Sequence, residues 1–198
     1  QVAHSTALHA RLVGTDEPYL VGPLARFALA ADRLAPRAAA LAEEVGLTRD
    51  ERNPFRSGLV RAIETVHALE VAHRLASAYT VPERSFVEVT PVAGFGSGWS
   101  EAPRGVLWHR YEIDADGLVV AATIVPPTAQ NQTVIEHDLW QGVERSLDLD
   151  DASLEAMCER IVRNYDPCIS CATHFLDLRV HRSSARGHPG DGPPHAVR

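Results

Sequence analysis

The 198-residue chain contains no lysine, and all 19 of its basic residues are arginines. Without a lysine amine it has neither a Schiff-base nucleophile nor the lysine of a Walker A phosphate loop. Its net charge of −7 argues against a nucleic-acid partner, because a phosphate backbone is bound through basic patches. These features exclude several common classes of enzyme and of binding protein.

Long apolar runs and cysteines are also scarce. The longest nearly apolar run, Leu118 to Val125, is far shorter than the roughly 20 residues of a membrane-spanning helix, so we expect no membrane crossing. The three cysteines are an odd number, and we see no secretory leader, which favours a reducing compartment over a disulfide framework. We therefore expect a cytoplasmic protein. Its 45% hydrophobic content suits one globular unit.

The first part of the chain is predicted to be helical. Apolar residues recur at helical spacing from Leu24 to Leu34. Pro36 suits the first turn of a second helix, and Asn53-Pro54 begins a longer helix that runs to about Tyr79.

The next part favours strands. Residues 86–89 have the composition of a strand, and residues 94–98 are predicted to form a glycine-rich loop. The GxGxG spacing of that loop differs from the GxGxxG dinucleotide fingerprint, and a strand rather than a helix follows it, so we expect no dinucleotide site. Residues 105–113 and 118–125 are predicted to pair as a β-hairpin across an Asp-Gly turn.

Two more helices are predicted near the C-terminal end. Thr133 and Glu136 have the spacing of a capping box, and a second helix runs from Asp151 to Asp166. Cys158 lies on the apolar face of that helix, so we interpret it as a core thiol rather than a ligand. The predicted fold class is α+β, mainly helical, with long antiparallel helices and a small antiparallel β-hairpin or sheet.

The most informative stretch is Asp-Pro-Cys-Ile-Ser-Cys-Ala-Thr-His at residues 166–174. It places two thiols three residues apart and an imidazole three residues further on, and thiolates select soft or borderline metals. A structural zinc site needs four ligands, whereas Cys158 is the only other cysteine. A thioredoxin-like redox pair follows a strand, whereas an amphipathic helix precedes this pair.

With its flanking residues, this stretch resembles the C-terminal nickel-binding motif of the large subunit of nickel-iron hydrogenases. The resemblance covers essentially residues 1–180, and three earlier blocks match the family in the same order. These blocks are PYLVGPLAR at 18–26, RNPFRS at 52–57 and EAPRG at 101–105. The stretches at 107–111 and 124–131 are similar to the soluble, cytoplasmic members that use NAD(P) or a deazaflavin.

The resemblance implies a nickel-iron centre whose iron carries carbonyl and cyanide ligands and which four cysteine thiolates hold. It implies that Cys168 is a terminal nickel thiolate that also accepts the proton, and that Cys171 is a thiolate bridging nickel and iron. His174 corresponds to a terminal histidine that helps to bind a magnesium or iron ion. The small β-sheet is expected near this metal site.

The resemblance also implies roles for residues around the metals. Arg104 matches an arginine that overhangs them and has been considered as the base in hydrogen cleavage. Because a guanidinium stays protonated in proteins, electrostatic stabilisation of the cyanides and of developing charge is an equal candidate. Asp166 matches a carboxylate above nickel that can pair with Arg104, and it also suits the end of a helix. Residues aligned with those that pack around the diatomic ligands are Pro103, Pro126 and Thr128.

The family takes its other two metal thiolates from an Arg-x-Cys-Gly-x-Cys motif, which this sequence lacks. We therefore expect residues 1–174 to be the C-terminal portion of a large subunit that is inactive alone and needs a missing N-terminal half. Residues 175–198 are expected to be an extension that a maturation endopeptidase removes. The implied partners are a small subunit with iron-sulfur clusters and diaphorase subunits with flavin.

The predicted function is the reversible heterolytic oxidation of H2 to protons and electrons, with the electrons passing through the small subunit to NAD(P) or another soluble acceptor. The alternative is a non-catalytic scaffold, as in the related large subunits of respiratory complexes. The pair of Cys168 and Cys171 with His174 favours the enzyme, because a scaffold has no physical need for two thiols there.

Overall fold

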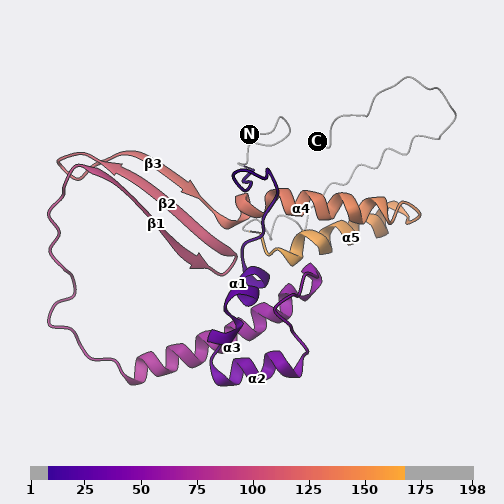
Figure 1. Cartoon of the computed structure of the whole chain (residues 1–198), viewed down its shortest axis with the longest axis horizontal. Helices are drawn as coiled ribbons and strands as arrows, with labels where there is room; N and C mark the ends of the chain where they lie inside the picture. The colour runs from indigo at the N-terminus through magenta and orange to yellow at the C-terminus, as the bar shows by residue number, and fades with distance from the viewer. Residues whose placement is uncertain (1–8, 168–198) are drawn as a thin grey trace.

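A computed structural model describes residues 9–167 of the chain. Its helical part and a three-stranded sheet lie side by side, and the sheet extends away from the helices as an arm (Figure 1). The helices are α1 (Pro23–Ala30), α2 (Pro36–Glu44), α3 (Ser57–Ser77), α4 (Pro127–Glu144) and α5 (Asp151–Asn164), and the strands are β1 (Gly94–Ala102), β2 (Gly105–Ile113) and β3 (Val119–Val125). Two short 3-10 turns, η1 (Ala31–Arg33) and η2 (Pro54–Arg56), precede α2 and α3. The predicted α+β, mainly helical class is confirmed.

The main hydrophobic core lies where α1, α2 and α3 meet. Its members are buried residues of the three helices together with one residue after α2: Leu24, Phe27, Ala38, Ala42, Leu47, Val60 and Ile63. The small side chains of Ala38 and Ala42 lie one turn apart on α2, so this helix packs closely on α3. This core holds the N-terminal half of α3 against α1 and α2.

Side chains of α3 cap the start of α2. The helix begins at Pro36, as predicted, but has no side-chain cap of its own. Instead, Ala35 N–H donates to Nδ1 of His67 at 3.0 Å, and Ala38 N–H donates to Oε2 of Glu70 at 3.2 Å. Two backbone donors that a helix leaves unpaired at its N-terminus are thereby satisfied from the neighbouring helix.

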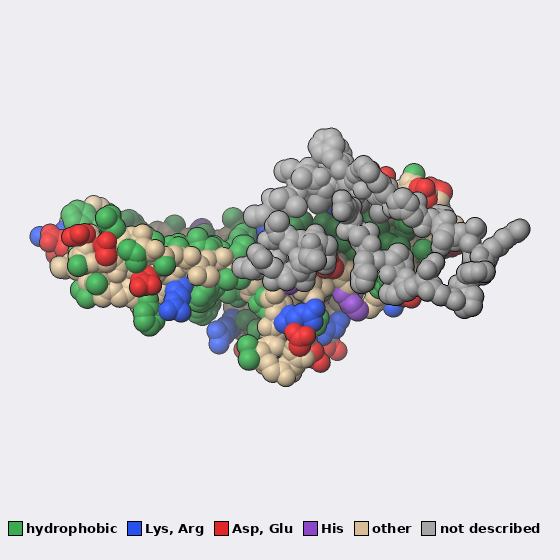
Figure 2. All heavy atoms as spheres, turned by 90° about the horizontal axis from the view of Figure 1, so that it is seen from above, with side chains coloured by type: hydrophobic (Ala, Val, Ile, Leu, Met, Phe, Trp, Pro, Cys, Tyr) green, Lys and Arg blue, Asp and Glu red, His purple; other side chains and the backbone are tan. Residues whose placement is uncertain are grey.

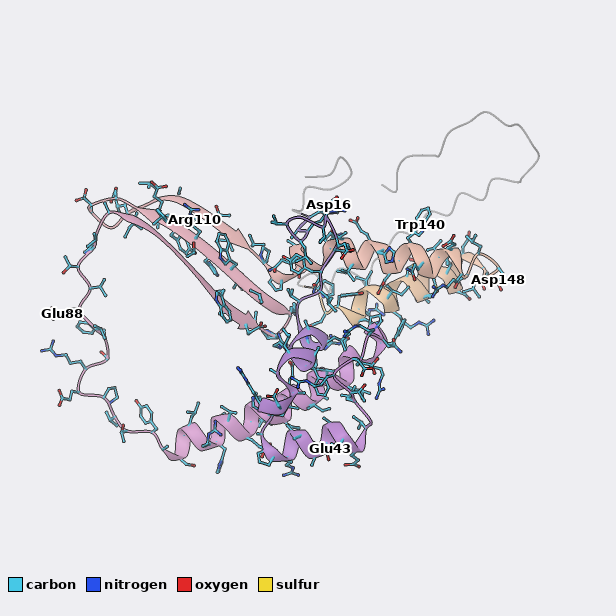
Figure 3. The ribbon with its side chains drawn as sticks, viewed as in Figure 1. Asp16, Glu43, Glu88, Arg110, Trp140 and Asp148 are labelled. Carbon is cyan, nitrogen blue, oxygen red and sulfur yellow. The ribbon has the colours of Figure 1, made fainter. Side chains whose placement is uncertain are left out.

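The sheet corrects two predictions. Residues 94–98 are not a loop but the first half of β1, which pairs antiparallel with β2 so that Gly94 lies opposite Ile113 and Trp99 opposite Trp108. Arg110, labelled on the sheet in Figure 3, makes a cation–π contact with β1, because its guanidinium carbon lies 4.6 Å from the centre of the Phe95 ring. Residues 86–89 are not a strand, because the connection between α3 and β1 brings no neighbouring strand beside them.

The predicted hairpin of β2 and β3 is confirmed, and its turn follows Asx-turn chemistry. Oδ1 of Asp114 accepts the backbone N–H groups of Asp116 and Leu118, and Gly117 supplies a φ of +81°. Both edges of the sheet are exposed, and Figure 2 shows hydrophobic side chains on the surface at this end of the molecule.

The two C-terminal helices form an antiparallel pair joined by residues 145–150 (Figure 1). Helix α4 starts at Pro127 rather than at Thr133, because the fixed φ of Pro127 suits the first helical position and the helix is already formed where the capping-box spacing occurs. Helix α5 is confirmed, with Asp150 as its N-cap. The side chain of Cys158 on α5 is only 3% exposed, so the prediction that it is a core thiol is confirmed. Within residues 9–167, no helix combines the length and the hydropathy that a membrane span requires.

Candidate metal centre

The turn between β1 and β2 presents Arg104 and rests against the segment that leads into α1. Gly22 and Gly105 have φ angles of +106° and +133°, which disfavour any side chain. A Cβ atom at position 22 would lie 2.6 Å from the carbonyl oxygen of Arg104, and one at position 105 would lie 2.8 Å from the nitrogen of Gly22. The two glycines therefore allow the backbone of the turn to contact the backbone of the segment before α1, and this contact fixes the position of the turn.

Two buried amide side chains of α4 hold the same segment from the other side. Asn131 accepts the Val21 N–H at 2.9 Å and donates to the Val21 carbonyl at 3.0 Å, much as a neighbouring strand would. Gln130 donates to the Val106 carbonyl at 2.6 Å and accepts the Tyr19 hydroxyl at 3.1 Å. Burial raises the pKa of Tyr19, so its hydroxyl remains a donor. These amides join α4, β2 and the segment before α1.

The C-terminal end of α5 is attached to two other helices. Ser57 and Arg61 at the start of α3 both donate to the carbonyl of Asn164. The hydroxyl of Tyr165 donates to the carboxylate of Asp138 on α4. Burial, and then this carboxylate, raise the pKa of Tyr165 far above its ordinary value, so the phenol stays neutral. The backbone that leaves α5 therefore starts from a fixed point.

Arg104 and Asp166 meet at this point, although they are 62 residues apart in the sequence. Nε of Arg104 donates to the carbonyl of Asp166 and lies 3.4 Å from its Oδ2. The two side chains are 30% and 33% exposed, so the pair is partly shielded from water. Asp166 has a φ of +46°, the left-handed region that aspartate tolerates better than most residues, and this turns the backbone out of the helical path. The next residue, Pro167, is buried.

Some of the remaining predicted site residues lie among the described residues, and the others lie outside them. Pro103 precedes Arg104 in the turn, whereas Pro126 and Thr128 lie where β3 passes into α4, directly before the two buried amides. Three predicted metal ligands, Cys168, Cys171 and His174, lie outside the described residues, as does the 175–198 extension. Among residues 9–167, no three His, Cys, Asp or Glu side chains gather in a group that could hold a metal ion.

Sequence reasoning assigned no role to several residues that build this framework. Arg26, Gln130 and Asn131 stood inside or beside matched blocks but received no function. Their main partners lie 24–111 residues away, so no local pattern reveals them. The available signal was compositional: two adjacent amides end the matched stretch at 124–131, and the structure buries them to 6% and 3% exposure.

A family model and individual relatives all match this chain to the same family. A family model for nickel-dependent hydrogenases matches residues 15–174. Sulfhydrogenase 2 subunit alpha of Pyrococcus furiosus is 35% identical over 180 residues, which cover 89% of this chain and 43% of that protein. The NAD-reducing hydrogenase HoxS subunit beta of Cupriavidus necator is 34% identical over 165 residues, covering 79% of this chain and 34% of that protein.

Solved structures agree with the sequence comparisons. An NAD+-reducing [NiFe]-hydrogenase in its H2-reduced state superimposes with a TM-score of 0.68 and 31% identity, over 82% of this chain and 37% of that one. A reduced, active Ni-Fe-Se hydrogenase from Desulfomicrobium baculatum gives a TM-score of 0.52 and 26% identity, over 80% and 35%. The chain thus spans less than half the length of these relatives. From its family model, its relatives and its fold, the chain belongs to the nickel-dependent hydrogenase family.

Proposed function

We propose that this chain supplies part of the nickel-iron centre, and the residues above it, of a hydrogenase that oxidises H2 reversibly to protons and electrons. Cys168 and Cys171 hold nickel and iron as thiolates, and two further thiolates come from a partner segment with the second CxxC pair. The donor types fit the metals, since thiolate sulfur prefers soft and borderline ions. The observation that carries the proposal is the contact of Arg104 with Asp166, two residues before Cys168.

The metal centre, once bound, provides an electrophile that polarises H2, a molecule with no charge and little polarity. The chain's own residues handle the proton and the surrounding charge. The Cys168 thiolate accepts the proton, because a metal-bound thiol is already deprotonated. Arg104 keeps its positive charge and stabilises negative charge that develops near it. Asp166 fixes the direction in which that guanidinium points.

Residues next to this pair shape the pocket. Pro103, Pro126 and Thr128 would line the carbonyl and cyanide ligands of the iron, and Pro103 and Pro126 are exposed in this chain. His174 helps to bind a magnesium or iron ion that stabilises the mature C-terminal segment. Residues 1–174 form the mature part, and an endopeptidase removes residues 175–198 after nickel insertion.

Electrons leave through partner subunits. An iron-sulfur small subunit carries them to diaphorase subunits with flavin, and from there to NAD(P) or another soluble acceptor in the cytoplasm. The relatives support this route in kind, since one of them is named an NAD-reducing hydrogenase subunit.

Nickel analysis of the complete hydrogenase isolated from its native host tests the proposal. Cys168→Ser and Cys171→Ser should each remove nickel and H2-dependent reduction of an artificial dye. Cys158→Ala is the matched control, because this thiol is buried in the core of α5, and it should keep both. Full nickel content and H2 uptake in Cys168→Ser would contradict the proposal. A wild-type complex that assembles stably without nickel would favour the non-catalytic scaffold instead.

A further inference from the structure

We infer that Arg26 is a positioning residue, whose guanidinium fixes the β1–β2 turn and so sets the orientation in which Arg104 meets Asp166. The inference rests on the proposed function, because only the proposed function gives Arg104 a role near the metals. It concerns a residue of α1 that makes no contact of its own with Asp166.

All five N–H donors of the Arg26 guanidinium are used. Nε and Nη2 donate to the two carboxylate oxygens of Glu64 on α3, both at 2.7 Å. Nη1 donates to Oε2 of Glu101 at 2.9 Å and to the Ala102 carbonyl at 2.9 Å, and Nη2 also donates to the Pro103 carbonyl at 2.8 Å. A guanidinium has five such donors in a rigid plane, whereas an ammonium has three on a flexible stem. The geometry is therefore specific to arginine.

The two carbonyls belong to the residues immediately before Arg104. The backbone N–H of Arg26 donates to the carbonyl of Gly22 at 2.8 Å, and Gly22 is the residue whose backbone lies against the Arg104 carbonyl. The turn is thus held both by hydrogen bonds from the Arg26 guanidinium and by a close backbone contact with the N-cap residue of the same helix. The bidentate pair with Glu64 anchors this arrangement to the middle of α3.

Charge supports the same arrangement. The side chains of Arg26 and Glu64 are 21% and 23% exposed, so the ion pair is only partly screened by water. Burial alone lowers the pKa of Arg26, but hydrogen bonds and attraction from Glu64 and Glu101 outweigh it, and the pKa is raised. Without the cation, two carboxylates would face the turn unpaired, and the Ala102 and Pro103 carbonyls would lose their donors. The turn would shift, and Arg104 with it.

The test uses the complete hydrogenase purified from its native host. Arg26→Gln should lower kcat for H2 oxidation by about 10- to 100-fold, the range for residues that orient a metal site or misplace a group by about 1 Å, while nickel content stays unchanged. Arg26→Lys, which keeps the charge and loses two donors, should lose less than Arg26→Gln. The control is Arg49→Gln. Like Arg26, Arg49 donates to two backbone carbonyls and pairs with a carboxylate, but its partners are Ala28, Leu29 and Asp32 rather than residues of the turn. This variant should keep kcat within about twofold.

A double variant separates positioning from general support. If Arg26 acts through Arg104, then Arg26→Gln combined with Arg104→Gln should be no slower than Arg104→Gln alone, within about twofold. If the two losses multiply, or if Arg26→Gln has the kcat of the wild type, the inference is wrong. Full activity of Arg104→Gln would instead contradict the proposed role of Arg104.

Amide hydrogen exchange gives a readout that does not depend on turnover. Peptides that cover residues 99–106 should exchange faster in Arg26→Gln than in the wild type or in Arg49→Gln, because the turn has lost its donors. If Arg26→Gln does not assemble, Glu101→Gln serves instead, since it removes one carboxylate and leaves the pair with Glu64. It should show faster exchange at the turn and a smaller loss of kcat, and wild-type values of both would overturn the inference.

Discussion

Replacing Gly22 by alanine tests whether the contact between the α1 segment and the Arg104 turn is as tight as described. Position 22 has a φ of +106°, and its new Cβ would lie 2.6 Å from the Arg104 carbonyl oxygen and 3.2 Å from the carbonyl carbon. Both atoms belong to backbone, so they cannot move aside as the end of a flexible side chain can. The substitution therefore has two separate costs.

The costs can be estimated one by one. Gly22 has φ +106° and ψ −155°, a region that essentially only glycine adopts, so a side chain there costs about 1–3 kcal/mol, and forcing an extra carbon into a packed site costs about 1–3 kcal/mol. The sum predicts that Gly22→Ala lowers the free energy of unfolding by about 2–6 kcal/mol. Gly46→Ala is the matched control, because Gly46 has a φ of +63° and nothing within 4 Å of its Cβ position. It should lose only the backbone term of about 1–2 kcal/mol.

Denaturant unfolding of both variants, followed in the same complete subunit, measures the difference. The account predicts that Gly22→Ala is less stable than Gly46→Ala by about 1–4 kcal/mol, which is the steric cost together with the larger backbone cost at position 22. It further predicts lower H2 oxidation in Gly22→Ala, because the displaced carbonyl belongs to Arg104. Equal stability of the two variants would refute the close contact.

Three further predictions concern the framework. Asn131→Ala removes two buried hydrogen bonds to Val21 and should lower the free energy of unfolding by about 2–4 kcal/mol in denaturant titrations. Burial and Asp138 raise the pKa of Tyr165, so the folded state keeps its proton to higher pH than the unfolded state does. The free energy of unfolding should therefore fall as pH rises above about 10, the ordinary tyrosine pKa, and Tyr165→Phe should weaken this fall. His67→Ala removes the acceptor of the Ala35 N–H at the start of α2 and should lower the free energy of unfolding by about 1 kcal/mol.

Two of these predictions have a control in the same helix. Gln132→Ala removes only a contact with Glu136 within α4, so it should cost well under the Asn131→Ala loss. His73→Ala changes an exposed side chain of α3 and should leave stability within about 0.5 kcal/mol. An alkaline decline of equal size in wild type and Tyr165→Phe would show that Tyr165 is not its source. A loss in His73→Ala equal to that in His67→Ala would contradict the capping contact.

Local signals predicted the helices well. The start at Pro36 depends on proline geometry. At Asn53-Pro54, where the longer helix was predicted to begin, proline and an Asn53 side chain that accepts the Phe55 N–H instead start the 3-10 turn η2, and α3 follows at Ser57. The start of α4 was predicted at the wrong place because two local signals competed, and the proline at position 127 formed the helix before the capping box at Thr133. Helix existence was thus easier to predict than helix start.

Pairing between distant segments could not be predicted in the same way. Whether residues 94–98 form a strand depends on β2 beside them, and residues 86–89 form no strand although their composition favours one. The site shows the same division. Family resemblance selected Arg104 and Asp166, whereas the partners of Arg26 and Asn131 emerge only when the chain is folded.

The account depends most on the claim that Cys168 and Cys171 hold nickel and iron next to the Arg104 and Asp166 pair. Nickel-edge X-ray absorption of the complete hydrogenase, isolated with its own maturation proteins, tests this directly. The account predicts nickel surrounded mainly by sulfur in the wild type and loss of that signal in Cys168→Ser. Zinc in place of nickel, or nickel bound only by nitrogen and oxygen in the wild type, would contradict it.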